Sequence, residues 1–454
     1  MKKRYLITLT AVLAMMVALI SACSSKSNDE GQSSSPSASA SSSSAASPSA
    51  SSDTPKGKVE IQFWYGWGGP EGELMEKMIK KFNDSQDQIV VKGTVEADYS
   101  KQLTAITAGN PPDVASNFGN ASVPNGENGA NTPLDDYMAK SDMSADLFVP
   151  GAIKQQQYNG KTYAVPVAMH YSALFYNKDL LAQAGYDKPP ETVQQLFEYF
   201  DKLSKIEANG EIKVLGLGPP SLPVYDYAYL FGGKFVDVDK GEITPQDTGF
   251  IQAMKQSAAL YKKAGGSEKV NAFTKKLGAG LSADDPFFTG KYAMTFGGEW
   301  TGTFIKKFAP NLNYGIAPMP YDENHPDMKG AASVDTSTFY IPKGAKHPDE
   351  AWKFIEWFLK PENIAEFDAG LGNLTPVLAA IDSPMFGDVA GFKEFLEGSK
   401  SPNLQSFPAS PYMSVYLNEI GVAFNDVLLN KISAEQAAKQ IADKMAPEVA
   451  KYKK

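Results

Sequence analysis

The chain of 454 residues contains a single cysteine, Cys23. One cysteine cannot form a disulfide within the chain, so no disulfide framework supports this fold. Cys23 follows what reads as an N-terminal export signal, with basic Lys2 to Arg4, an apolar stretch from Leu6 to Ile20, and the small residues Ser21 and Ala22. The apolar stretch is too short for an ordinary transmembrane helix.

Histidine and arginine are also scarce. The three histidines are scattered along the chain, at His170, His325 and His347, which argues against a histidine-rich metal site. The sequence contains no G-x-x-x-x-G-K, H-E-x-x-H or G-x-S-x-G motif. The formal net charge is -9, and the chain has very few arginines. It therefore lacks the basic surface expected of a nucleic-acid-binding protein. We therefore expect no catalytic residue, metal, cofactor or nucleic-acid partner.

One string resembles the start of a calcium-binding loop. It places Asp237, Asp239 and Gly241 at alternate positions. The sixth position of such a loop should be Gly and is Glu242, and the twelfth should be Glu and is Thr248. The string instead predicts a polar hairpin turn between residues 235 and 243.

Residues 24 to 56 consist almost entirely of Ser, Ala, Pro and a few other polar residues. They contain no periodic apolar face, so no burial offsets the entropy of ordering them. This segment is expected to be a flexible tether that reaches roughly 30 Å on average. With 43% hydrophobic residues overall, the remaining chain is long enough for two to three domains.

The composition changes at Lys58, where an α/β pattern begins. Apolar residues alternate from Val59 to Phe63 as in a half-buried strand, and those from Leu74 to Phe82 recur at helical spacing. A strand over 89–91, a helix around Leu103 and Ile106, and a strand from Val114 follow. This β-α-β-α-β order predicts a mostly parallel sheet with helices on its faces.

The middle of the chain repeats this pattern, and the last third is more helical. Strands are predicted over 163–167, 173–176, 212–217 and 292–296, and a helix over 352–359. Capping boxes are predicted at Thr192 to Gln195 and at Ser433 to Gln436. This order predicts two lobes that the chain crosses more than once.

Aromatic residues stand beside polar residues in several turn-like places. Trp67 lies in a glycine-rich turn after the first strand, and ligands of open α/β sheets bind beyond the carboxyl ends of strands. A sugar presents apolar faces that stack on aromatic rings and hydroxyl groups that need donors and acceptors. The same mixture recurs at Asn117 to Asn120, His170-Tyr171, Tyr225 to Tyr227, Glu299-Trp300, and Phe407 with Tyr412. Each aromatic could instead be a core residue.

From about Lys58 to Lys454 the chain resembles the family 1 extracellular solute-binding proteins, whose familiar members bind maltodextrins and other sugars. The most specific segment runs from Tyr163-Ala164-Val165-Pro166 to Tyr176-Asn177-Lys178-Asp179-Leu180, the crossover between lobes. The other matching segments are Val59 to Gly69, Gly109 to Val114, Met294 to Trp300 and Ala351 to Ile355.

The resemblance implies an α/β, two-lobed periplasmic-binding-protein-like (type II) fold with hinge crossovers and a ligand between the lobes. The expected organisation is a lipoprotein signal peptide over 1–22 and a lipidated Cys23 with its tether over 23–56. Lobe 1 would comprise 57–168 and 318–373, and lobe 2 would comprise 169–317 and 374–454.

The resemblance also implies ligand contacts. Trp300 falls on the family's stacking tryptophan, and Asn120 on a polar contact. His170 stands where maltodextrin binders have an acid, which leaves the particular sugar open, and it could instead pack at the hinge. The full set of expected ligand contacts is Trp67, Asn117, Asn120, His170, Tyr171, Tyr225, Asp226, Glu299, Trp300, Asp335 and Tyr412.

Ile20-Ser21-Ala22-Cys23 is similar to the lipobox of bacterial lipoproteins, with Ile20 where Leu is usual. That likeness implies a diacylglycerol thioether on Cys23, cleavage before it, and anchoring by lipid to the outer face of the bacterial cytoplasmic membrane. The alternative is a plain signal peptide followed by a chance cysteine.

The sequence therefore predicts a monomeric binding lipoprotein that captures a carbohydrate, expected to be an oligosaccharide, and delivers it to the membrane subunits of an ABC importer. Two alternatives remain open. One is a binding protein for a non-sugar solute, such as a polyamine, phosphate ester or peptide. The other is a secreted glycan hydrolase, for which acidic pairs such as Asp135-Asp136 and Asp284-Asp285 are available.

Overall fold

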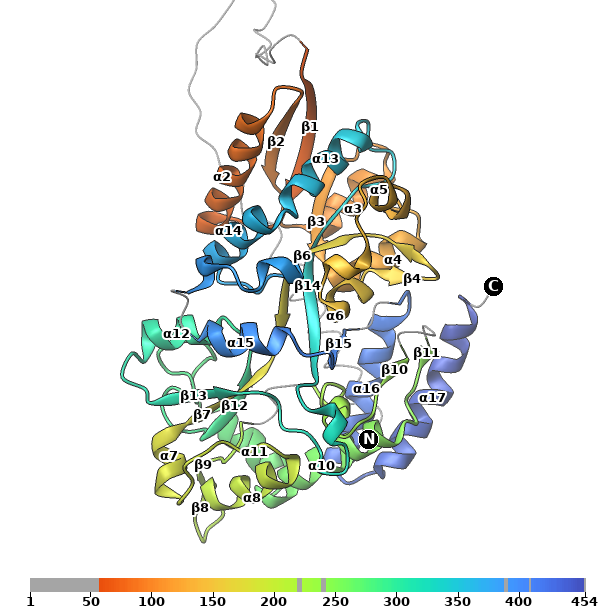
Figure 1. Ribbon diagram of the computed structural model, residues 1–454. Helices are drawn as coiled ribbons and strands as arrows, with labels where there is room; N and C mark the ends of the chain where they lie inside the picture. The colour runs from red at the N-terminus through yellow and green to blue at the C-terminus, as the bar shows by residue number, and fades with distance from the viewer. Residues whose placement is uncertain (1–56, 219–222, 238–241, 388–390, 408–409, 453–454) are drawn as a thin grey trace, which may run out of the picture. The chain divides into compact units, whose positions relative to one another are not determined.

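We analysed a computed structural model of the chain (Figure 1). It describes residues 57–218, 223–237, 242–387, 391–407 and 410–452. The expected signal peptide, Cys23 and the tether to residue 56 lie outside the described residues. The described residues all belong to one compact unit.

The first sheet is mixed and has the strand order β15-β14-β3-β1-β2, with β6 also paired to β14. Strands β1, β2 and β3 are parallel to one another, as the alternation predicted, whereas β14 runs antiparallel to β3 and β6. The strands are β1 (Val59–Tyr65), β2 (Ile89–Val95), β3 (Val114–Phe118), β6 (Val165–Tyr171), β14 (Ala332–Tyr340) and β15 (Leu404–Ser406).

Helices cover this sheet because their apolar faces need a partner to bury against. Figure 1 shows α2, α13 and α14 beside β1 and β2, and α14 contacts α2. Phe63 of β1, Phe339 of β14 and Phe354 of α13 meet in its core. The helices are α2 (Gly69–Ser85), α3 (Tyr99–Thr107), α4 (Ser122–Glu127), α5 (Asp135–Lys140), α6 (Pro150–Lys154), α13 (Pro348–Phe358) and α14 (Pro361–Leu371).

The second sheet has three strands in the order β12-β7-β13, all antiparallel, so the parallel pattern does not extend to it. Its strands are β7 (Ala173–Asn177), β12 (Met294–Gly297) and β13 (Tyr314–Ala317). Central β7 pairs with strands that arrive much later in the chain. Local alternation cannot specify the direction of such distant partners.

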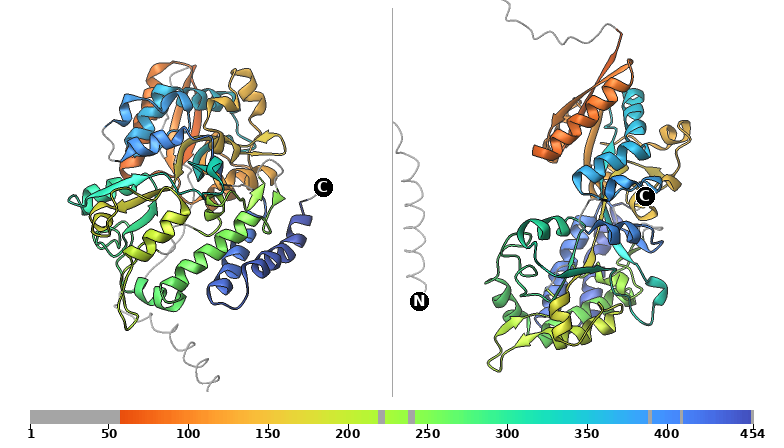
Figure 2. Two further views of the ribbon diagram at one scale, coloured as in Figure 1. Left: turned by 60° about the horizontal axis from the view of Figure 1, so that its bottom comes forward. Right: turned by 60° about the vertical axis from the view of Figure 1, so that its left-hand side comes forward.

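Helices also surround the second sheet, and Figure 2 shows α16 and α17 beside α10. The helices are α7 (Lys178–Gln183), α8 (Val193–Leu203), α9 (Tyr227–Leu230), α10 (Thr248–Lys263), α11 (Ser267–Thr274), α12 (Thr301–Phe308), α15 (Phe392–Ser399), α16 (Met413–Leu428) and α17 (Ala434–Ala450). The capping boxes predicted at Thr192 and Ser433 are both present, before α8 and α17.

The remaining elements are short. Hairpin β10 (Val236–Asp237) and β11 (Glu242–Ile243) confirms the turn predicted there, although residues 238–241 lie outside the described residues. The strand predicted over 212–217 ends at Val214 as β9 (Ile212–Val214) and pairs with β8 (Lys205–Ile206). The others are β4 (Gln157–Tyr158), β5 (Lys161–Thr162), η1 (Gly119–Ala121), η2 (Ala145–Leu147), η3 (Pro326–Met328), η4 (Leu378–Ala380) and η5 (Pro384–Phe386).

The chain passes from one sheet to the other at more than one place. Strand β6 belongs to the first sheet and β7 to the second, and only Ser172 separates them. The segment after β13 returns to the first sheet as β14, and Met169 of β6 forms a bridge with Leu374. These crossings produce the expected two-lobed fold. Strands β6 and β14 are paired where the chain crosses between the two lobes.

Candidate functional site

A hollow of about 210 Å³ lies at the end of β6 and the start of β14, where the chain passes between the two sheets. Five of the predicted ligand contacts line it: His170, Tyr171, Asp226, Trp300 and Asp335. They come from β6, β14 and the segments before α9 and α12, which are distant in sequence. The remaining lining residues are Ser172, Met319, Ala332, Ser333 and Phe407.

Strand β14 places acceptors along one edge of the hollow. Ser333 and Asp335 are two residues apart, so they project to the same face of the strand. Asp335 lies opposite His170 in the pairing of β14 with β6. The side-chain amide of Gln155 donates to Asp335 Oδ1 at 2.9 Å, which fixes this carboxylate in place.

His170 is joined to a fully buried carboxylate from the other lobe. Its Nδ1 lies 2.6 Å from Oε1 of Glu299, which follows β12. Burial alone would lower the pKa of His170, but the charge and hydrogen bond of Glu299 and the charge of Asp335 outweigh it and raise that pKa above its usual value. Glu299 therefore lies behind the hollow and orients the imidazole rather than lining it.

Asp226 is a partly buried acid with unused hydrogen-bonding capacity. Burial raises the pKa of Asp226 to about 7, the hydroxyl of Ser333 opposes this shift, and the charge of Asp335 adds to it. Asp226 Oδ1 has no hydrogen-bond partner among the described residues. A buried polar atom left unpaired is costly, so a ligand hydroxyl at this position would be favourable.

Trp300 is the aromatic surface of the hollow. Its ring stands edge-on to His170, with centroids 5.8 Å apart, and its side chain is 40% exposed. A Cβ atom at residue 298 would lie 2.4 Å from the indole of Trp300. Gly298 is therefore required for the ring to occupy its observed position.

A second hollow of about 410 Å³ adjoins the first. Ser172 and Trp300 line both. The second hollow extends into the second lobe along β12 and the segment before it, including Leu281, Asp285 and Thr295. The indole of Trp300 therefore borders two adjoining spaces.

Two predicted contacts lie beside the hollow without lining it. Tyr225 packs against Phe407, with ring centroids 5.9 Å apart, and Glu299 lies behind His170. Tyr171, which does line the hollow, donates its hydroxyl proton to the backbone oxygen of Phe395 at 2.5 Å. That hydroxyl is therefore already used within the protein.

The structure does not bring the other four predicted contacts to the hollow. Trp67 packs edge-on against Phe339 and Phe367 of the first lobe's core. Asn117 is buried, and its side-chain oxygen accepts from the backbone of the next residue. The two others are Asn120, exposed in η1, and Tyr412, buried against Tyr452.

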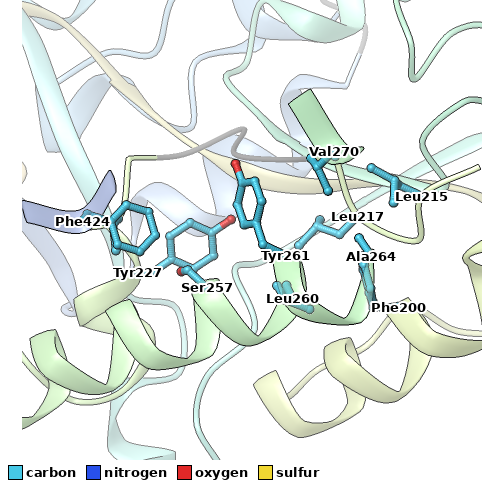
Figure 3. Close-up of a pocket in the computed structure, with 12 residues that line it drawn as sticks. Phe200, Leu215, Leu217, Tyr227, Ser257, Leu260, Tyr261, Ala264, Val270 and Phe424 are labelled. Atoms are coloured by element: carbon cyan, nitrogen blue, oxygen red, sulfur yellow. The ribbon is translucent and has the colours of Figure 1, made fainter. Parts of the chain in front are cut away.

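A different cavity, of about 40 Å³, lies within the second lobe (Figure 3). Figure 3 shows that the labelled side chains around it are apolar except for the hydroxyl groups of Tyr227, Ser257 and Tyr261. None of the described residues that line it is charged, and it has room for little more than water. It is a packing void between α8, α10 and their neighbours rather than a site for a solute.

Sequence reasoning missed Ser172, Met319, Ala332, Ser333 and Gln155. Ser333 could have been found from Asp335, because residues two apart on a strand share a face. Gln155 carried no such signal, since it reaches Asp335 from α6 through tertiary packing alone. Within the described residues, no group of three or more His, Cys, Asp or Glu is placed to hold a metal, and no helix is long and apolar enough to cross a bilayer.

The chain matches known proteins over most of its length. The profile of the bacterial extracellular solute-binding proteins matches residues 77–394. The chain is 25% identical over 338 residues to the sn-glycerol-3-phosphate-binding periplasmic protein of Escherichia coli. The aligned region covers 71% of this chain and 75% of that protein.

Two solved structures have similar folds. CpMnBP1 with mannotriose bound is 30% identical, with a TM-score of 0.68, over 85% of this chain and 99% of that chain. The sugar-binding protein MalE from Xanthomonas citri is 22% identical, with a TM-score of 0.73, over 87% of this chain and 98% of that chain. The second likeness concerns the fold alone.

Proposed function

The chain belongs to the family of bacterial extracellular solute-binding proteins, and on that premise we propose that it captures an oligosaccharide between its lobes for an ABC importer. The observation that carries this proposal is the hollow itself. There an exposed indole, Trp300, stands beside the acids Asp226 and Asp335 and the imidazole of His170. Aromatic faces with convergent hydrogen-bonding groups are what a sugar ring requires.

Mannooligosaccharides are the first sugars to test. The protein solved with mannotriose shares 30% of its residues with this chain over nearly its whole length. The hollows on the two sides of Trp300 offer space for more than one ring. We therefore propose a ligand of two or more sugar residues.

The relative that binds glycerol phosphate suggests a competing ligand. A phosphate group calls for arginine, lysine or a helix N-terminus. Arg4 is the only arginine of the chain, and the hollow is lined by two acids and one histidine, with no lysine among the described lining residues. The hollow therefore offers hydrogen-bonding groups suited to neutral hydroxyl groups, and its described lining lacks the lysine or arginine that would bind a phosphate.

The proposed mechanism is closure of the lobes around the sugar. His170 and Asp335 lie where the sheets meet, whereas Asp226 and Trp300 come from segments of the second lobe. A ligand that contacts both sets favours the closed form by its differential affinity for it. The importer's membrane subunits would then bind that form, and we propose that this chain acts as a monomer and catalyses no reaction.

We further propose that lipid on Cys23 holds the protein at the outer face of the cytoplasmic membrane. Support comes from the lipobox-like sequence and from the exported character of the family. Two acyl chains on one cysteine give firm anchoring where one chain does not. A Cys23→Ser variant should appear in the medium or periplasm; retention of that variant in washed membranes would contradict the proposal.

The central test is titration calorimetry on the purified chain with mannobiose, mannotriose, maltose, maltotriose and sn-glycerol 3-phosphate. We expect heat of binding with at least one oligosaccharide, none with the phosphate ester, and no sugar product after long incubation. Small-angle scattering on the same samples should give a smaller radius of gyration with ligand. Binding of glycerol phosphate alone would overturn the sugar assignment, and product release would overturn the binding-only role.

A further inference from the structure

Exposed aromatic side chains are rare in this protein. The chain contains 25 Phe, 21 Tyr and 5 Trp. Among the described residues, only Phe118, Trp300 and Tyr452 are exposed, and Phe118 is the most exposed at 49%. An exposed aromatic ring is available for stacking against a ligand, and its position relative to the hollow decides whether a ligand there could reach it.

Phe118 lies close to the hollow through the pairing of the strands. It ends β3 and stands opposite Ser337 of β14. Ser337 is two residues from Asp335, so both project to the same face of β14, about 7 Å apart along the strand. Asp335 stands opposite His170, which in turn contacts Trp300. Phe118 and Trp300 therefore flank the same row of polar groups, Phe118 from the first lobe and Trp300 from the second.

The ring of Phe118 is held in position. Tyr99 of α3 stands edge-on to it, with centroids 5.5 Å apart and planes inclined by 71°. A Cβ atom at Gly66 would lie 2.3 Å from the Tyr99 hydroxyl, so glycine at this turn allows Tyr99 to support Phe118. A fixed ring loses little entropy when a ligand stacks on it.

We propose that Phe118 is a second sugar-stacking surface, which receives the sugar residue next to the one at Trp300. The site then takes a chain of at least two sugar residues, and Phe118 selects for chain length. This inference rests on the proposed capture of an oligosaccharide. The polar row of Ser333, Asp335 and His170 would bind hydroxyl groups between the two aromatic surfaces.

The test compares affinities along a series of sugar lengths. Calorimetry on the full chain would use mannose, mannobiose and mannotriose, with glucose, maltose and maltotriose as a second series. We expect Phe118→Ala to weaken trisaccharide binding about tenfold, since a stacked ring and its buried area are lost. Binding of the monosaccharide, where measurable, should change less than about twofold. Phe118→Tyr retains the aromatic face and should restore trisaccharide affinity.

Val422→Ala is the matched control, because Val422 is 48% exposed but lies on α16, outside both hollows. Its affinity should equal that of the unaltered chain. Unchanged trisaccharide affinity in Phe118→Ala, with the unaltered chain binding normally, would overturn the inference and leave Phe118 free to contact an importer. An equal loss for monosaccharide and trisaccharide would also overturn it. An unaltered chain that binds neither sugar series would refute the proposed function, and the inference with it.

Discussion

Two tryptophans of this protein stand in similar glycine-rich turns after strands, yet they have different surroundings. Trp67 follows β1 and lies against Phe339 and Phe367, with ring centroids 6.1 and 5.4 Å away. Trp300 follows β12, and its one ring contact within the described part of the chain is with the imidazole of His170. Aromatic side chains from β14 and α14 pack against Trp67 in the first turn. Trp300 in the second turn borders two hollows instead.

The comparison shows that the partners supplied by other elements decide what an aromatic residue does. Trp67 meets two phenylalanines that arrive about 270 and 300 residues later in the chain, so its ring stabilises the first lobe. No phenylalanine of the described residues packs against Trp300 in this way, so its ring is available to a ligand. The variants below test this division, from the largest expected effect to the smallest.

Trp67→Ala should destabilise the protein by about 3 kcal/mol, because it removes a large side chain from an aromatic cluster. Urea denaturation of the ligand-free protein, followed by circular dichroism, would measure the change. Sugar affinity of the folded variant should stay close to normal. A stable variant that no longer binds sugar would place Trp67 in the ligand site and end the distinction between the two turns.

Asp226→Asn should stabilise the protein by about 2 kcal/mol at pH 8 and by much less at pH 4. The folded protein holds the Asp226 proton up to about pH 7, whereas the unfolded chain releases it near pH 4, so the acid destabilises the fold progressively as pH rises between these values. The asparagine amide still requires burial, which keeps the gain below the roughly 4 kcal/mol of a three-unit shift.

The measurement for Asp226→Asn is urea denaturation of both proteins at several pH values between 4 and 8. The difference between their unfolding free energies should grow with pH. A difference that is the same at pH 4 and pH 8 would show that the pKa of Asp226 is the same in the folded and unfolded states, and its role as a protonated acid in the hollow would be withdrawn.

Trp300→Ala should weaken sugar binding about tenfold or more while leaving stability within about 1 kcal/mol, because the lost ring is partly exposed. Calorimetry and urea denaturation on the same preparation would separate the two effects. Leu429→Ala is a suitable control, since Leu429 is also 40% exposed and lines neither hollow. Loss of the cooperative unfolding transition would instead make Trp300 a structural residue like Trp67.

Gly298→Ala should give a smaller loss of affinity, about threefold, because the new methyl group displaces the indole of Trp300 without removing it. The double variant Gly298→Ala with Trp300→Ala should bind no worse than Trp300→Ala alone. Additive losses would show that Gly298 acts on the ligand by another route than the position of Trp300.

Much of the architecture was predictable because its signals are local. Alternating residues specified β1, and capping boxes specified the starts of α8 and α17. The direction of β7 was not predictable, because its partners β12 and β13 follow more than a hundred residues later. Of the eleven predicted contacts, five line one hollow, two lie beside it and four lie elsewhere, since the local sequence shows the residue type but not which distant segments pack over it.

The sequence by itself determined the class of this protein, because strand and helix periodicity, capping and the crossover segment act over a few residues each. It also supplied a surplus of aromatic and acidic residues able to bind a sugar. Only the tertiary structure decided which of them face solvent together. The pairing of β14 with β6 and β3 brings Asp335, His170 and Phe118 onto one surface, and Trp67 packs, partly buried, against the core of the first lobe. Burial depends on contacts between distant segments, and these contacts form only in the folded chain.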